Sequence, residues 1–265
     1  MEIDKDKNLR DKQKDHFNSI ADNYINIRKT NQGHLEFKKI LWEYFFSKNA
    51  LDLEKADILE PMCGYAEGYD IIKNYSNIII NNYSGFDYSE NIVNYCNNNR
   101  KNLNIYFLDI INFNESNKFD LAIIIGGFHH VYRDADLAIK NVSNSIKSNG
   151  YIINFEPTNE MKIIKNVRAK IYKYNNFFDE KSEKDFNLKQ LNNIFQNHDL
   201  DLINNYRVGY LAYIFFYNPD AFPIFSKIPK FLVRFLFNID ILISRIFFIN
   251  KLSFATISIY KKNKN

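Results

Sequence analysis

The 265-residue chain is poor in cysteine, proline and glycine, with two, five and eight residues of these types. The two cysteines, Cys63 and Cys96, cannot build a disulfide framework, so we expect a protein of the reducing cytosol. There is no Cys-x-x-Cys pair, and only His129 and His130 are adjacent among the five histidines, so we expect no metal site. No apolar segment follows the first residues, and we therefore expect no signal peptide.

A strong excess of charge of one sign is also absent. The chain has 35 Lys and Arg residues against 31 Asp and Glu residues, which leaves a net charge of +4. This is well short of the electrostatic footprint of a nucleic-acid-binding protein, so no nucleic-acid partner is expected. With 46% hydrophobic residues, the chain is long enough for one full core and a small elaboration.

The central motif is the stretch 58–68, Ile-Leu-Glu-Pro-Met-Cys-Gly-Tyr-Ala-Glu-Gly. A short apolar strand over 57–59 ends in Glu60 and continues into a loop with Gly64 and Gly68, after which a helical pattern begins. Such a loop presents backbone N–H groups and the positive end of the helix dipole to a ligand. An ordinary strand-to-helix turn has the same pattern, so the flanking sequence has to distinguish a ligand-binding loop from such a turn.

Four further apolar strands follow, and each ends in an acidic residue or a small-residue loop. At the end of the second strand of the unit, Asp87 is placed to accept hydrogen bonds from ribose hydroxyls. The alternation of short strands with helices predicts a mostly parallel sheet with helices on both faces, where ligands bind outside the carboxyl ends of the strands. The expected strands cover 83–89, 105–109, 119–125 and, after a turn at 148–150, 151–156.

These motifs, in this order, resemble the class I S-adenosylmethionine (SAM)-dependent methyltransferases, in their small-molecule branch. The segment 60–68 resembles the first motif of that family, an acid followed by G-x-G-x-G, although Met62 stands at the first glycine and Ala66 at the third. The resemblance spans roughly 55–157. It implies an α/β, Rossmann-like class I methyltransferase fold: a seven-stranded, mostly parallel sheet with helices on both faces and an antiparallel last strand. The segments of this chain that resemble the later motifs of the family are 85–89, Asp109, 119–131 and 146–151.

The same resemblance implies that SAM is the cofactor and S-adenosylhomocysteine the product. The segment 17–24 is similar to an F-x-x-I-A-x-x-Y helix that folds over the cofactor in this branch, which makes Tyr24 a lid contact and Arg28 a candidate for the methionyl carboxylate. The alternative is that Tyr24 packs in the core and Arg28 is solvated, because this interpretation is compatible with the same spacing. The other cofactor-binding residues that the resemblance implies are Glu60, Met62, Gly64, Asp87, Tyr88, Asp109, Ile110 and Gly126.

We divide the chain into a helical lid over 1–50 and a SAM-binding methyltransferase domain over 51–265. Residues 1–15 are dominated by charge, and we expect a frayed, solvated helix or a disordered start. Apolar residues recur at helical spacing from 17 to 27. Further helices are expected over 35–48, 160–174 and 187–197, and further strands over 200–208 and 252–260.

A strongly apolar segment over 210–250 separates the last two strands and resembles an insertion in the family fold. One interpretation is a helical cap or a homodimer face; the other is peripheral contact of 222–250 with an anionic membrane surface. Charges interrupt each apolar run well short of the roughly 20 residues that a spanning helix needs. The protein is therefore expected in the cytoplasm, either free or at the membrane surface. The basic residues expected to share one face of the insertion are Lys227, Lys230, Arg234 and Arg245.

The candidates for a general base are His130 and His129, at the end of the fourth strand, because histidine titrates near neutrality. A base is needed only where the acceptor keeps its proton, as an alcohol does. Glu156, Tyr206 and Arg207 follow later strands and are candidates for holding the acceptor. The sequence does not select among these groups.

We expect in-line O-methylation of a small polar acceptor, such as a sugar or a surface-glycan precursor. The absence of an N-P-P-Y motif after the fourth strand argues against amino methylation of nucleic-acid bases. Two alternatives remain: a methyltransferase for a membrane lipid or quinone, and an inactive SAM-fold regulatory partner. Nicotinamide cofactors are disfavoured because no full G-x-G-x-x-G follows the first strand.

Overall fold

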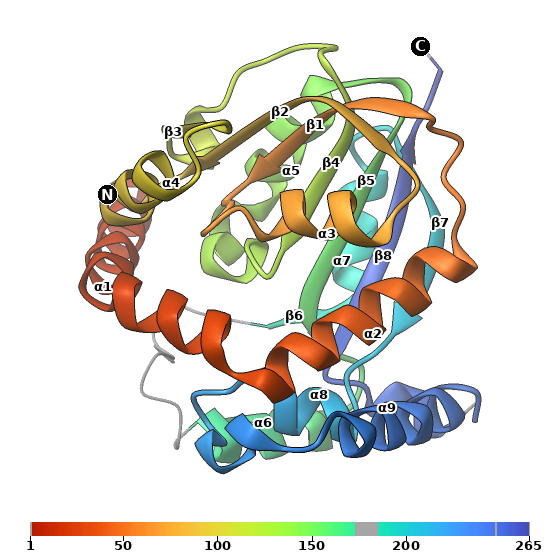
Figure 1. Ribbon diagram of the computed structural model, residues 1–265. Helices are drawn as coiled ribbons and strands as arrows, with labels where there is room; N and C mark the ends of the chain where they lie inside the picture. Colours follow the sequence, from red (N-terminus) through yellow and green to blue (C-terminus); the bar gives the residue numbers. More distant parts are fainter. Residues whose placement is uncertain (1, 173–184, 247, 265) are drawn as a thin grey trace.

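The structure is a computed structural model that describes residues 2–172, 185–246 and 248–264 (Figure 1). In these residues an eight-stranded sheet has the order β3-β2-β1-β4-β5-β8-β7, and β6 pairs only with β5. The strands are β1 (Lys55–Pro61), β2 (Ile79–Asp87), β3 (Asn104–Phe107), β4 (Phe119–Ile125), β5 (Ile146–Asn159), β6 (Phe186–Asn187), β7 (Leu200–Arg207) and β8 (Ala255–Lys262).

The predicted fold class is confirmed. Strands β1 to β5 pair in parallel, whereas β8 is antiparallel to both β5 and β7. The two-residue strand β6 was not predicted, because so short a segment has no periodicity to detect. The turn expected at 148–150 lies instead within β5, where Asn149 has a φ of 65° and the register with β4 shifts.

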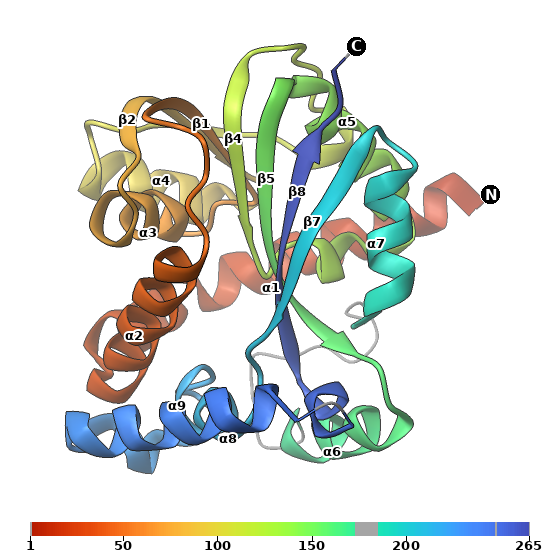
Figure 2. The ribbon, with the colours of Figure 1, turned by 90° about the vertical axis from the view of Figure 1, so that its right-hand side faces the viewer.

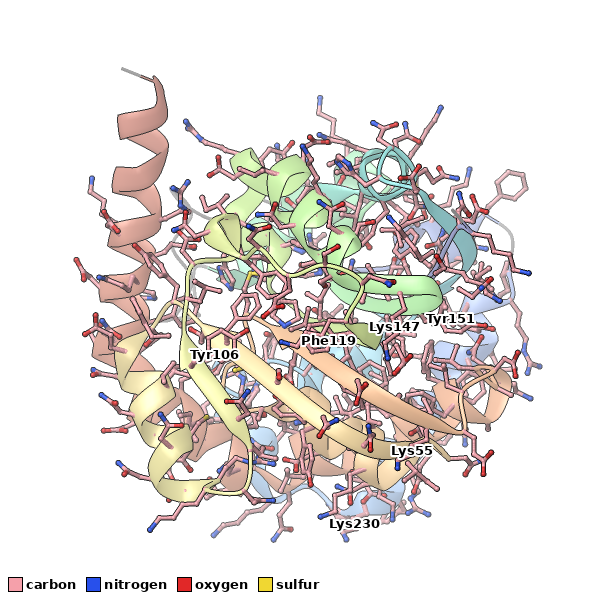
Figure 3. All side chains as sticks on the ribbon, turned by 90° about the horizontal axis from the view of Figure 1, so that it is seen from above. Lys55, Tyr106, Phe119, Lys147, Tyr151 and Lys230 are labelled. Atoms are coloured by element: carbon pink, nitrogen blue, oxygen red, sulfur yellow. The ribbon has the colours of Figure 1, made fainter. Side chains whose placement is uncertain are left out.

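Helices cover both faces of the sheet (Figure 2). One face carries α2 (Gln32–Lys48), α3 (Glu67–Tyr75) and α4 (Glu90–Asn99); the other carries α5 (Ala135–Ser145) and α7 (Leu188–Gln196). On the first face Trp42 of α2 packs edge-on against Phe155 of β5, with ring centroids 5.9 Å apart. On the second face Phe195 stacks on Tyr260 at 4.0 Å. Seen from above, Lys55 and Phe119 mark the amino ends of β1 and β4 (Figure 3), so the carboxyl ends lie at the opposite edge.

The first helix, α1 (Glu2–Thr30), is continuous through the residues that we expected to be frayed or disordered. That expectation is wrong for residues 10–15, because Arg10 bonds Asp109 and Gln13 is only 6% exposed. The next helix begins after Asn31, whose side chain accepts a hydrogen bond from the amide of His34 at 2.9 Å. Helix α1 therefore lies against the carboxyl edge of the sheet and is separated from α2 by one capping residue.

The insertion forms a helical layer below the sheet in Figure 1, together with α6 (Lys162–Tyr172). Its elements are α8 (Leu211–Phe216), η3 (Pro223–Lys227), α9 (Lys230–Ser244) and η4 (Ile249–Leu252). The expected face of four basic residues is wrong in part, because Lys227 belongs to η3 and Pro229 separates it from α9. Residues 173–174 of the helix predicted over 160–174 lie outside the described residues.

Candidate active site

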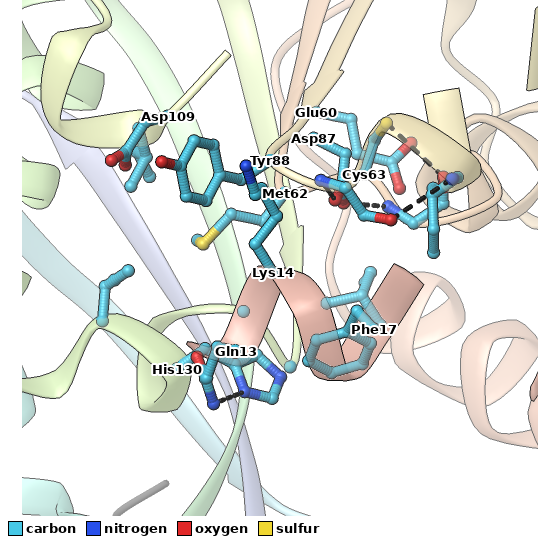
Figure 4. Close-up of a pocket in the computed structure, with 18 of the residues that line it drawn as sticks. Gln13, Lys14, Phe17, Glu60, Met62, Cys63, Asp87, Tyr88, Asp109 and His130 are labelled. Carbon is cyan, nitrogen blue, oxygen red and sulfur yellow. Dashed lines mark hydrogen bonds between the residues drawn. The ribbon is translucent and has the colours of Figure 1, made fainter. Parts of the chain in front are cut away.

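A cleft lies between α1 and the carboxyl ends of β1, β2 and β4, beside the short helices η1 (Ile110–Asn112) and η2 (Phe128–Asp134) (Figure 4). Strands β2 and β4 flank β1 on opposite sides, so the strand order reverses here, which is where ligands bind in open α/β sheets. The cleft encloses about 940 Å³, including open solvent at its mouth. The predicted site residues that line it are Tyr24, Glu60, Met62, Gly64, Asp87, Tyr88, Asp109, Ile110, Gly126 and His130.

The first loop carries left-handed backbone at each position where the family motif has glycine. The φ angles of Met62, Gly64 and Ala66 are 52°, 51° and 62°. Left-handed backbone costs an L-residue roughly 1–2 kcal/mol, so glycine is favoured there, yet the loop keeps this geometry with Met and Ala. The side chain of Met62 is accommodated because its neighbour Gly127 has none: a Cβ there would lie 2.7 Å from Met62 Cε.

At Gly64 the backbone is open to the cleft. A Cβ built there meets no heavy atom within 4 Å, although Gly64 lines the cleft. A glycine with nothing above it, at the end of β1, leaves the kind of cradle in which a ligand can approach the main chain closely.

Glu60 joins the end of β1 to the start of α3. It is 1% exposed, and its carboxylate accepts hydrogen bonds from the amides of Gly68 and Tyr69 at 2.8 and 3.0 Å and from the hydroxyl of Tyr83 at 2.6 Å. Burial nevertheless raises the pKa of Glu60 to about 8. Gly68 has to be glycine, because a Cβ would lie 2.7 Å from the carboxyl carbon of Glu60.

Asp87, at the end of β2, is fixed between two loops. Its Oδ2 accepts a hydrogen bond from the Gly64 amide at 3.0 Å, and its Oδ1 accepts one from the Ser89 amide at 2.9 Å. Burial raises the pKa of Asp87, while these two hydrogen bonds act in the opposite direction. The carboxylate is thus held at the cleft wall in one orientation.

Helix α1 brings charged residues into the cleft that the sequence analysis assigned to solvent. Arg10 Nε donates to Asp109 Oδ2 at 3.2 Å and also pairs with Asp134, while Lys14 lies over the ring of Tyr88. A periodic signal was present, because the cleft-facing residues recur every three, four or seven positions along one helix face. They are Arg10, Gln13, Lys14, Phe17 and Tyr24.

The two adjacent histidines have different partners. His129 Nδ1 lies 2.9 Å from Oε2 of Glu156, which is fully buried and also accepts from the Phe128 amide at 2.6 Å. His130 Nδ1 lies 3.0 Å from Nε2 of Gln13, and the two imidazole centroids are 3.9 Å apart.

These partners present opposite hydrogen-bonding groups to the two rings. The carboxylate of Glu156 accepts hydrogen bonds, so it favours a proton on Nδ1 of His129. The amide nitrogen of Gln13 donates, so it favours a proton on Nε2 of His130. The two rings are therefore held in different environments beside the cleft.

Several predicted residues lie outside the cleft lining. The guanidinium of Arg28 bonds Asp220 of the insertion at 2.8 Å and covers the ring of Tyr24 at 3.7 Å, so it is not placed at the cleft. His129 also stands behind the lining, with its Cε1 beside Gly126.

Two of the candidates for holding the acceptor are also elsewhere. Arg207 pairs with Glu160 at 2.5 Å, and together with Tyr206 it lines a separate pocket beside α9. The third candidate, Glu156, uses its two carboxylate oxygens for hydrogen bonds with His129 and the Phe128 amide.

Comparison with known proteins agrees with this architecture. The profile of a family described as "Methyltransferase domain" matches residues 52–202, which is more than half of the chain. No curated protein has a matching sequence.

Solved structures resemble the chain at low sequence identity. A chain from a complex of the Haloferax volcanii Trm112 methyltransferase activator with a methyltransferase has a TM-score of 0.62 at 10% identity, covering 94% of this chain and 98% of its own. A SAM-dependent methyltransferase from Archaeoglobus fulgidus has a TM-score of 0.55 at 14% identity, with coverage of 90% and 99%. An O-methyltransferase from a trans-AT PKS multienzyme of Brevibacillus brevis, in complex with S-adenosylhomocysteine, has 0.53 at 16%, with 84% and 72%. At these identities the likeness shows a shared fold.

Proposed function

The chain belongs to the methyltransferase domain family and is a SAM-dependent methyltransferase, and on that premise we propose that it methylates an oxygen of a small polar acceptor, such as a sugar or a surface-glycan precursor. The observation that carries the proposal is the convergence of Gly64, Asp87, Asp109 and His130 on one cleft beneath α1. A hydroxyl acceptor is favoured because the pair of histidines next to this cleft can take up a proton.

The cleft residues fit SAM. Gly64 leaves room for close approach to the main chain, and Asp87, which is fixed at the cleft wall, would accept hydrogen bonds from the ribose hydroxyls. Asp109 and Ile110 follow β3 and are assigned to the adenine end, while the carboxylates around the cleft complement the positive charges of SAM. When bound, SAM supplies a sulfonium-linked methyl group that a nucleophile attacks in line.

The main task of the protein is then alignment. Holding donor and acceptor in a near-attack geometry can supply about 7–11 kcal/mol of the barrier. Helix α1 covers one side of the cleft through Arg10, Gln13 and Phe17, which limits the access of water to the reacting groups. We assign the uptake of the proton to the histidine pair: His130 lines the cleft and contacts the acceptor, and His129, held at Nδ1 by Glu156, lies directly behind it. His130 is assigned to orient the acceptor by donating from Nε2.

The acceptor can be tested with purified full-length protein and SAM. Release of S-adenosylhomocysteine would be measured with nucleotide sugars and polar metabolites, and in parallel with quinones and lipid vesicles. Turnover with a hydroxylated polar compound, and none with the apolar set, is the expected result. Turnover restricted to quinones or lipids would overturn the choice of acceptor and leave methyl transfer intact.

Two observations support other functions. The exposed apolar surface of the insertion favours a membrane lipid or quinone as acceptor. Met62 and Ala66 at glycine positions favour an inactive regulatory partner, although the loop retains left-handed backbone at both positions and the strand-end acids are present. An inactive partner would release no S-adenosylhomocysteine with any acceptor.

A further inference from the structure

The outer face of α9 is apolar and exposed. Val233, Phe237 and Asp240 point inward and are at most 7% exposed. On the opposite side of the helix, Phe231 and Phe235 are 68% and 59% exposed and so present their rings to solvent. Other large apolar side chains of the insertion that are exposed include Ile224, Leu242, Ile246 and Phe248. Aromatic side chains rarely gather on a surface without a partner.

The charge on this outer surface has one sign. Between residues 210 and 254 the only acids in the sequence are Asp220 and Asp240, and both are used internally. Asp220 has a side chain 3% exposed and binds Arg28, while Asp240 is 3% exposed and accepts from the Ala212 amide at the start of α8. The basic residues of the same segment are Lys227, Lys230, Arg234, Arg245 and Lys251, all exposed.

The basic side chains flank the apolar face along one edge. Lys230 and Arg234 lie on the side of α9 that meets α2, where they form ion pairs with the buried Glu36 at 3.9 and 2.7 Å while their side chains remain 71% and 56% exposed. Long basic side chains beside exposed aromatic rings suit a helix lying flat in a lipid interface, with the rings among the acyl chains and the cations at the headgroups.

The insertion lies at the same end of the molecule as the cleft. It connects the end of β7 to the start of β8, and β7 runs parallel to β5, so it lies at the carboxyl edge of the parallel strands. Figures 1 and 2 both show α6 in the same layer, and α6 adds Ile163, 56% exposed, with Lys162 and Lys165 beside it.

We propose that this docking surface, made by the outer sides of η3 and α9 and by residues 245–246 and 248–251, with α6 beside them, binds an anionic membrane surface. A second copy of the chain fits poorly, since a two-fold interface would place the basic edge against itself with no exposed acid of the insertion to pair with it. No helix of the described part of the chain is long and apolar enough to cross a membrane, so α9 would lie in the plane of the interface.

The test is co-sedimentation of the full chain with vesicles of phosphatidylcholine mixed with phosphatidylglycerol, against phosphatidylcholine alone. Lys227→Gln/Lys230→Gln removes two charges from the docking surface. The matched control, Lys55→Gln/Lys101→Gln, removes two exposed charges at other places on the domain. A third variant, Phe231→Ser/Phe235→Ser, removes the two exposed rings, and its thermal melting confirms that it folds.

We expect binding to the anionic vesicles only, weakened about 30-fold in the first variant, unchanged in the control and weakened in the ring variant. Equal loss in control and test variants would mean nonspecific attraction, and would overturn the proposal. Failure of the unmodified protein to bind anionic vesicles would also overturn the proposal. If the ring variant then dissociated a homodimer, the surface would be an interface between two copies of the chain. Binding of S-adenosylhomocysteine should be unchanged in all variants, which separates this proposal from the methyltransferase function.

Discussion

The carboxylate of Asp87 and the backbone amide of Gly64 are joined by a hydrogen bond of 3.0 Å that links the end of β2 to the loop after β1. We predict that Asp87→Ala weakens S-adenosylhomocysteine binding roughly 10- to 150-fold, since a hydrogen bond to a charged group contributes about 1.5–3 kcal/mol. Calorimetric titration measures the change. Asp201→Ala, at an exposed position of β7, is the control. Unchanged affinity in a folded Asp87→Ala protein would contradict the ribose assignment.

Ala66, the N-cap residue directly before α3, has a φ of 62° and a ψ of 49°. Because glycine adopts this conformation without steric cost, we predict that Ala66→Gly leaves the free energy of unfolding unchanged or raises it by up to about 1 kcal/mol. Ala138→Gly, in the interior of α5, is the matched comparison and should lose about 1 kcal/mol or more. Urea denaturation of the two variants decides the point. Equal losses would show that the left-handed position carries no strain.

Burial raises the pKa of Glu60 to about 8, whereas the unfolded carboxyl titrates near its ordinary value of about 4.3. Between these pH values the folded chain holds a proton that the unfolded chain has lost, so the free energy of unfolding should fall as the pH rises from 5 to 8. Glu60→Gln should flatten this slope, and Glu54→Gln, at an exposed site, should not. Denaturation curves at several pH values measure it. A slope that survives in Glu60→Gln would assign the pH dependence to other groups.

The protonation of the two histidines can be predicted and tested without knowing the methyl acceptor. Nitrogen-15 NMR of the imidazoles should show His129 protonated on Nδ1 and His130 on Nε2, because Glu156 accepts from the first and Gln13 donates to the second. Gln13→Leu should change the tautomer ratio of His130 and leave His129 as it is. The same tautomer in both rings would remove the basis for giving them different roles.

The strand ends could be predicted from sequence because their signals are local. Short apolar runs followed by Glu60, Asp87 and Asp109 place three acids at one edge of a parallel sheet, and the predicted family is confirmed. The left-handed backbone at Met62 could not be seen in the sequence. Its side chain is tolerated only because Gly127, far along the chain, offers no Cβ.

Long-range partners explain the expectations that were wrong or incomplete. Arg28 has the spacing of a cofactor contact, but Asp220, 192 positions away, binds it. The composition of the charged start of the chain predicts that it is solvated, yet Arg10 forms ion pairs with Asp109 and Asp134. Composition describes the average environment of a charge, whereas one ion pair decides where a particular side chain lies.

The most direct test of the account is calorimetric titration of the purified protein with S-adenosylhomocysteine, with NAD as the control ligand. We predict micromolar binding of S-adenosylhomocysteine and no binding of NAD. In Gly64→Val the side chain would enter the open space above the loop, so binding should be lost while the sheet still folds. Absence of binding by the unmodified protein, or normal affinity in Gly64→Val, would contradict the assignment of this cleft to SAM.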